Sequence, residues 1–146
     1  MNREIRFRAK RKDWRKLPKE ERWVEGDLIQ NIFGGMKRMW ITSESYDKER
    51  LRSVHKHITE WRGIEIDSDT ICQYTGLNDK NGKKIWENDI VELPDEVGCF
   101  VCEWEEDTAR FVMNGDGLTV DFDNYWGYQT EVAGNIFDNP GVLEVE

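Results

Sequence analysis

The chain has 146 residues with a hydrophobic content of 38%, a charged content of 35% and a formal net charge of −9. This length suits one domain with a sizeable core, and seven Trp, six Phe and four Tyr argue against disorder. No apolar run approaches the roughly 20 residues that cross a bilayer, and the first residues lack the apolar stretch of a secretory signal, so we expect a cytoplasmic protein without membrane contact.

Charge is unevenly distributed along the chain. Residues 1 to 22 hold ten Lys and Arg against four Asp and Glu, a net charge of +6, whereas the remaining residues hold 11 against 26, a net charge of −15. A basic arm therefore precedes an acidic body. The cysteines Cys72, Cys99 and Cys102 are odd in number and follow no export signal, which favours reduced thiols over a disulfide framework.

Alternating apolar and charged residues from Arg3 to Arg8 predict a short half-buried strand with Ile5 and Phe7 on one face, followed by a long polar loop from Lys10 to Arg22. Clustered Lys and Arg can bind the phosphates of nucleic acid. The alternatives are a solvated loop, or an arm that lies on the acidic body and supports self-association. The residues of this candidate arm are Arg6, Arg8, Lys10, Arg11, Lys12, Arg15 and Lys16.

A second strand is predicted over residues 23 to 33, closed by a Gly-Gly turn and followed by residues 39 to 42. Its stretch Glu25-Gly26-Asp27-Leu28-Ile29 matches Glu87-Asn88-Asp89-Ile90-Val91 step for step. The match suggests one local solution in both places, a turn residue and then an Asp that bonds nearby backbone amides. Catalysis by Asp27 or Asp89 is the sharper alternative, but a structural corner is the commoner use of such residues.

Residues 45 to 61 carry Leu51, Val54 and Ile58 at helical spacing, which predicts one short helix of about three turns. Ile64 to Ile66 and Thr70 to Thr75 return to strand character, with a bend at residues 67 to 69 between them.

The densest turn signal is Asn78-Asp79-Lys80-Asn81-Gly82, flanked by the strand-like residues 71 to 75 and 84 to 93, and it predicts a central antiparallel hairpin. Further strands are expected at residues 97 to 104, 109 to 113, 118 to 122 and 132 to 137. The strands at residues 109 to 113 and 118 to 122 are predicted to form a second hairpin, in which Val120 and Phe122 face inward. The strand at 97 to 104 places Phe100, Cys102 and Trp104 on one face.

The sequence contains no strong catalytic or metal motif. Cys99 and Cys102 have the spacing of a zinc pair that His55, His57 and Cys72 could complete, but in a strand the two thiols point to opposite faces. Residues 121 to 124 resemble the beginning of a calcium-binding loop, but the sixth position of that loop would be Trp126 instead of the required glycine. Nucleophile elbow, phosphate loop and dinucleotide fingerprint are absent. We therefore expect no catalytic residues, no metal and no cofactor, and predict a protein that is not an enzyme.

The aromatic count instead predicts a protein-contact surface, because aromatic residues are the preferred anchors of such surfaces. Nucleic-acid binding by the basic arm is the alternative function, and mimicry of DNA by the acidic body ranks after both. The candidate contact residues are Trp86, Trp104, Tyr125, Trp126 and Tyr128.

Several stretches, taken together, resemble the YopX family of phage and prophage proteins. They are residues 3 to 9, 23 to 29, 73 to 82, 85 to 91 and 134 to 140, with Asn88 where the family usually has glycine. The resemblance implies one domain over residues 1 to 146 with a mainly β fold of coiled antiparallel sheets, in which residues 70 to 137 form a small barrel of the SH3 type. It also implies a phage-encoded accessory protein in a bacterial cytoplasm, and it supplies no biochemical activity.

Overall fold

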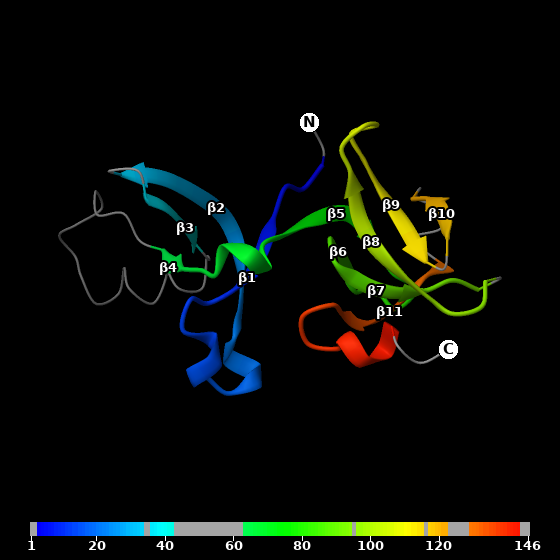
Figure 1. Ribbon diagram of the computed structural model, residues 1–146, viewed down its shortest axis with the longest axis horizontal. Helices are drawn as coiled ribbons and strands as arrows, with labels where there is room; N and C mark the ends of the chain where they lie inside the picture. The colour runs from blue at the N-terminus through cyan, green and yellow to red at the C-terminus, as the bar shows by residue number, and fades with distance from the viewer. Residues whose placement is uncertain are drawn as a thin grey trace. The chain divides into compact units, whose positions relative to one another are not determined.

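A computed structural model of the protein describes residues 3–33, 36–42, 63–94, 96–115, 117–122 and 129–143. The described elements form two antiparallel sheets of six and five strands, together with short 3-10 helices that lie along the chain between strands or after the last strand (Figure 1). The prediction of a mainly β fold is therefore confirmed. No helix of the described residues is long and apolar enough to cross a membrane.

The chain divides into two compact units. The N-terminal unit comprises residues 5 to 73, and the C-terminal unit comprises residues 74 to 146 together with residues 1 to 4. The boundary falls inside strand β5 (Cys72–Asn78), so this strand begins in one unit and continues in the other. Whether the chain folds as a single domain stays a prediction.

The strands of the N-terminal unit contribute to a sheet with the order β4-β3-β2-β1-β5-β6. The small core of this unit consists of Ala9, Met39, Ile41 and Ile66. The elements are β1 (Phe7–Lys10), η1 (Trp14–Lys16), η2 (Lys19–Glu21), β2 (Trp23–Phe33), β3 (Met36–Thr42), β4 (Ile64–Glu65) and η3 (Ser68–Thr70).

The start of the chain differs from its prediction. Strand β1 begins at Phe7 rather than Arg3, Ile5 is 43% exposed, and the segment expected to be a loop contains η1 and η2. Burial in β1 also increases towards its end instead of alternating, because both Ala9 and Lys10 are buried.

The C-terminal unit contains the larger core, made by Ile85, Val91, Leu93, Phe100, Cys102 and Met113. Strands β8, β9 and β10 lie side by side in its sheet, which has the order β10-β9-β8-β7-β11 (Figure 1). The elements are β6 (Lys84–Trp86), β7 (Asp89–Glu92), β8 (Cys99–Glu105), β9 (Arg110–Gly115), β10 (Leu118–Asp121), β11 (Glu131–Asn135) and η4 (Pro140–Leu143).

Both predicted hairpins are present. Strand β5 pairs with β6 across the turn at residues 79 to 83, and β9 pairs with β10. Val120 and Phe122 pack against the core, while Thr119 and Asp121 are exposed, as expected. Among the described residues, no pairing joins the outer strands β10 and β11, so the five-stranded sheet is open there and the expected closed barrel is not seen. The helix predicted over residues 45 to 61 lies outside the described residues.

The prediction that residues 25 to 29 and 87 to 91 form the same local corner is wrong. Asp89 is buried in a corner between β6 and β7, and its Oδ2 accepts a hydrogen bond from the Trp86 backbone N–H at 2.8 Å. Asp27 is instead exposed in the middle of the long strand β2, where it pairs with Thr42. Gly26 pairs with Phe7 of β1, so the backbone there runs on as strand and needs no corner.

Candidate interaction surfaces

The predicted basic arm is an integral part of the N-terminal unit. The Lys10 backbone N–H donates to the Thr70 hydroxyl at 2.8 Å, and the Asp67 N–H donates to the Lys10 carbonyl at 2.8 Å. The Lys12 N–H likewise donates to the Glu65 carbonyl at 3.0 Å. Residues 10 to 12 are therefore tied to the segment around β4 and η3, which explains why a sequence rich in charge folds here as ordered structure.

Several cationic side chains of this region lie over the rings of Trp14 and Trp23. Lys10 is only 1% exposed, and its Nζ lies 3.9 Å from the ring centroid of Trp14 and 5.5 Å from that of Trp23. The faces of aromatic rings are electron-rich, so they can accompany a cation that is removed from water. Arg8 stacks over Trp23 at 4.8 Å, and Arg15 and Arg22 lie over Trp14 at 4.4 and 5.4 Å.

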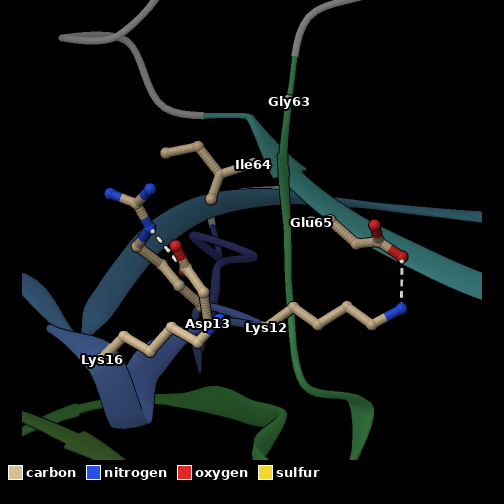
Figure 2. Close-up of a pocket in the computed structure, with 7 residues that line it drawn as sticks. Lys12, Asp13, Lys16, Gly63, Ile64 and Glu65 are labelled. Carbon is tan, nitrogen blue, oxygen red and sulfur yellow. Dashed lines mark hydrogen bonds and ion pairs between the residues drawn. The ribbon is translucent and has the colours of Figure 1, made fainter.

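An open groove of about 610 Å³ lies in the N-terminal unit, lined by residues of the segments 11 to 16 and 63 to 65. In Figure 2, Lys12 extends to the Glu65 carboxylate, a separation of 3.2 Å between Nζ and Oε2. Nε of Arg11 lies 3.4 Å from Oδ1 of Asp13. The groove is lined by Arg11, Lys12, Asp13, Lys16, Gly63, Ile64 and Glu65.

Glu65 is the electrostatic centre of this region. The Arg38 guanidinium donates to both of its carboxylate oxygens, at 3.0 and 2.9 Å. These hydrogen bonds, opposed by burial and assisted by Lys12, lower the pKa of Glu65 to about 2. The carboxylate is therefore ionised at neutral pH, where it holds two cations in place and has no proton to donate.

The seven residues of the predicted arm do not gather into one cationic face. Arg6 pairs with Glu25 at 3.6 Å, and Arg11 and Lys12 pair with acids of the same unit as described above. Arg8, Lys10 and Arg15 lie over tryptophan rings. Lys16 is exposed and lines the groove. Much of the positive charge is thus balanced locally, which weakens the case for phosphate binding.

The two units nevertheless differ strongly in net charge. The N-terminal unit holds 16 Lys and Arg against 12 Asp and Glu, a net charge of +4, whereas the C-terminal unit holds 5 against 18, a net charge of −13. These values sum to the −9 of the whole chain. The acidic excess of the C-terminal unit is therefore too large for its own cations to balance.

The residues of the predicted aromatic surface differ in their exposure. Trp86 is 4% exposed and packs against Tyr74 at a centroid distance of 5.5 Å, so its expected place on the surface is wrong. Trp104 is 42% exposed, and its ring meets Phe111 edge to face at 5.0 Å and 71°. Tyr125, Trp126 and Tyr128 lie outside the described residues.

The cysteines are free thiols, of which Cys72 and Cys102 are buried. Burial, and then the nearby Glu92 carboxylate, raise the pKa of Cys99, so its thiol stays protonated at neutral pH and is a poor nucleophile. His55 and His57 lie outside the described residues.

Glu65, Arg38 and the tryptophans Trp14 and Trp23 were not singled out by the sequence reasoning. The recurrence of tryptophan inside a Lys/Arg-rich stretch is a signal that could have identified the ring-stacked cations. No comparable signal points to Glu65, because its partners Lys12 and Arg38 are distant in the sequence.

Comparison with known proteins places this architecture. The model of the YopX protein family matches residues 6–144. The chain belongs to the YopX family. The solved structure titled "Crystal structure of protein EF1440 from Enterococcus faecalis" is similar at 21% identity with a TM-score of 0.50, over 97% of this chain and 99% of that one, which shows a shared fold alone. None of the curated proteins matches the chain.

In this YopX-family chain the corner before β7 contains an asparagine in a left-handed backbone conformation. Asn88 adopts φ of +70°, in the left-handed region that asparagine tolerates better than other residues with side chains. The Asn88 N–H donates to the Cys102 carbonyl at 2.7 Å, and its carbonyl accepts from the Ile136 N–H at 3.1 Å. The corner therefore joins three parts of the C-terminal unit.

Proposed function

We propose that this YopX-family protein is a non-enzymatic interaction module that binds a basic protein partner through the surface around Trp104. The observation that carries the proposal is the half-exposed Trp104 ring, held edge to face by its cross-strand neighbour Phe111. A large aromatic ring with few rotatable bonds loses little conformational entropy on binding, which makes it a good anchor.

Charge supports a basic partner. Trp104 is followed directly by Glu105, Glu106 and Asp107, and the unit that carries it has a net charge of −13. Arg110 compensates part of this charge by pairing with Asp121 at 2.8 Å and with Glu105 at 3.5 Å. The remaining acids attract cations over a Debye length of roughly 8 Å at physiological salt, which favours association with positively charged protein surfaces.

Photo-crosslinking inside expressing cells tests this proposal. A photoreactive residue at the exposed position Asp107 should give a discrete protein adduct that is lost in a Trp104→Ala chain. The matched control carries the photoreactive residue at Val97, which is 98% exposed and lies in another loop of the same unit. An adduct of twice the chain mass would indicate a second copy of this protein, whose N-terminal unit has a net charge of +4.

The proposal fails if positions 107 and 97 give the same adducts, or if the adduct persists unchanged in the Trp104→Ala chain. Urea unfolding of that variant checks that its fold is intact. When the crosslinking is repeated in cell lysate, the yield of the adduct at position 107 should fall as the salt concentration rises, because exposed charges are screened.

Nucleic-acid binding by the N-terminal unit is the second candidate. The net charge of +4 and the cations stacked over Trp14 and Trp23 favour it, since single-stranded nucleic acids bind surfaces that combine positive charge with aromatic rings. Anisotropy of labelled single-stranded DNA should then rise at low salt and fall with Lys16→Glu, but not with Lys80→Glu in the other unit. No rise at low salt excludes this candidate.

The fold and setting implied by the family fit the interaction module. In the C-terminal unit the last strand, β11, returns beside β7, the first strand of the meander β7 to β10. This position of β11 beside β7 supports our proposal that the C-terminal unit is a small barrel of the SH3 type, whose surface would contact the partner protein. We place the protein in the cytoplasm of the bacterial host as a phage-encoded accessory protein.

A further inference from the structure

The sequence contains two Asn-Gly steps, Asn81-Gly82 and Asn114-Gly115, and the structure gives them opposite surroundings. We propose that Asn81 is a site of spontaneous covalent modification, at which its side-chain amide is lost through a cyclic imide, and that Asn114 is protected from the same reaction. The inference depends on the geometry of the two steps and not on the proposed function.

Asn81 lies in the exposed turn between β5 and β6. Its neighbour Gly82 has φ of +79°, and a Cβ atom at that position would meet nothing within 4 Å. The open space around Gly82 leaves room for the backbone of this turn to rearrange. The Gly82 N–H donates to the Asp79 carbonyl at 3.0 Å, and in an exposed turn water can replace this bond.

The reaction needs only water. The Gly82 nitrogen loses its proton to solvent and forms a bond to Cγ of Asn81, and ammonia leaves as the Cγ–Nδ2 bond breaks. A five-membered succinimide ring results. Water then adds to one of the two ring carbonyls and opens the ring, which gives either aspartate or isoaspartate at position 81. No oxidant, reductant or enzyme takes part.

Asn114 is held away from this geometry. Its Nδ2 donates to Oε2 of Glu103 at 2.6 Å, and its Oδ1 accepts from the Thr119 hydroxyl at 2.7 Å. The backbone lies in β9 between β8 and β10, and a Cβ atom on Gly115 would lie 2.7 Å from the Cys99 carbonyl oxygen. Cyclisation at Asn114 therefore requires the sheet to open locally.

Modification at position 81 would act on a structural junction. The Asn81 N–H donates to Oδ1 of Asp79, whose other oxygen accepts from the Val132 N–H in β11. Isoaspartate inserts one extra methylene into the backbone of this turn, and either product adds a negative charge beside Asp79. Both products should weaken the attachment of the central hairpin to β11.

Peptide mapping of the full chain tests the proposal after incubation at mildly alkaline pH, with isoaspartate detected by enzymatic carboxyl methylation. In the folded protein we expect Asn81 to react at least about tenfold faster than Asn114, which corresponds to about 1.4 kcal/mol of local opening free energy. In urea the two rates should converge. Asn81→Gln should remove the product at position 81 and leave the slow reaction at Asn114.

Thr119→Val supplies the matched control, because it releases one bond to Asn114 at an exposed position. It should speed reaction at Asn114 and leave Asn81 unchanged. Equal rates at the two sites in the folded protein would overturn the proposal. So would a folded protein in which Asn81 stays intact while it reacts in urea, since the Gly82 bond to Asp79 would then be protective.

Discussion

The carboxylate of Asp79 accepts a hydrogen bond from the backbone N–H of Val132 at 3.0 Å, across 53 positions of the chain. The same carboxylate accepts from the N–H groups of Asn81 and Lys83 at 2.9 Å each. Asp79 is 3% exposed. Its hydrogen bonds with Asn81 and Lys83 organise the hairpin turn, and its hydrogen bond with Val132 attaches that turn to β11. Burial acts to raise the pKa of Asp79, but the hydrogen bonds from Val132, Lys83 and Asn81 outweigh it and leave the pKa below its ordinary value.

Replacement of Asp79 by alanine should lower the free energy of unfolding by about 2–4 kcal/mol, because three hydrogen bonds to a charged acceptor are lost at once. Urea unfolding measures this change. Asp121→Ala is the matched control, since its exposed carboxylate makes a surface ion pair with Arg110 and should change stability by less than about 1 kcal/mol. Equal losses in the two variants would show that Asp79 is not the organising residue.

Glu65 of the N-terminal unit should account for much of the loss of folding stability at acidic pH. Its pKa is lowered from 4.5 to about 2, so the folded state gains stability above about pH 4.5 and loses it as pH falls towards 2. Allowing for solvent screening, the contribution should be about 1–2 kcal/mol. Urea unfolding over that pH range should give a shallower pH dependence for Glu65→Gln than for the wild type.

The control for this pH experiment is Glu131→Gln, which removes an exposed ion pair with Lys80 at 3.0 Å. It should leave the slope of stability against pH close to that of the wild type. Asp79 also loses stabilisation on acidification, since its pKa is lowered too, and it accounts for residual pH dependence in the Glu65→Gln chain.

The hairpins were predictable because their signals are local. Residues 78 to 82 combine side chains that bond their own backbone with a glycine at φ of +79°, and this chemistry defines the turn whatever surrounds it. The family was predictable for a related reason, since short motifs are spread along most of the chain.

Burial of individual aromatic residues was not predictable, because it depends on what covers each strand. Ile85 and Trp86 are consecutive in β6 and both are buried, so alternation fails where a strand is covered on both faces. The wrong prediction of a common corner has a similar origin. Residues 25 to 29 resemble residues 87 to 91, but pairing of Gly26 with the distant strand β1 keeps the first stretch extended. Five matching residues cannot specify such a partner.

Backbone strain at two positions in the C-terminal unit yields a further prediction. Ala109 adopts φ of 52°, a left-handed conformation that disfavours residues with a Cβ, whereas Asn88 at φ of 70° tolerates it better. Ala109→Gly should therefore raise the free energy of unfolding by about 0.5–1 kcal/mol, and Asn88→Gly should change it less. Thermal unfolding of both variants measures the difference. Ala9→Gly, in the buried part of β1, is the control and should destabilise the protein.

The buried lysine of the N-terminal unit gives the last prediction. Lys10 is 1% exposed and its Nζ lies over the rings of Trp14 and Trp23, so Lys10→Met keeps the hydrocarbon stem and removes the cation from both rings. The variant should be destabilised by about 0.5–2 kcal/mol if the ring contacts stabilise the folded state.

Urea unfolding of Lys10→Met should be compared with Lys16→Met, at an exposed lysine that lines the groove, for which a change within about 0.5 kcal/mol is expected. Trp14→Leu then separates the two possible origins of the effect. If the rings stabilise the cation, Lys10→Met should be less destabilising in the Trp14→Leu chain than in the wild type, because one of its ring partners is already missing. If the Lys10→Met variant is as stable as the wild type, the contacts between the Lys10 cation and the two rings add nothing to the free energy of unfolding.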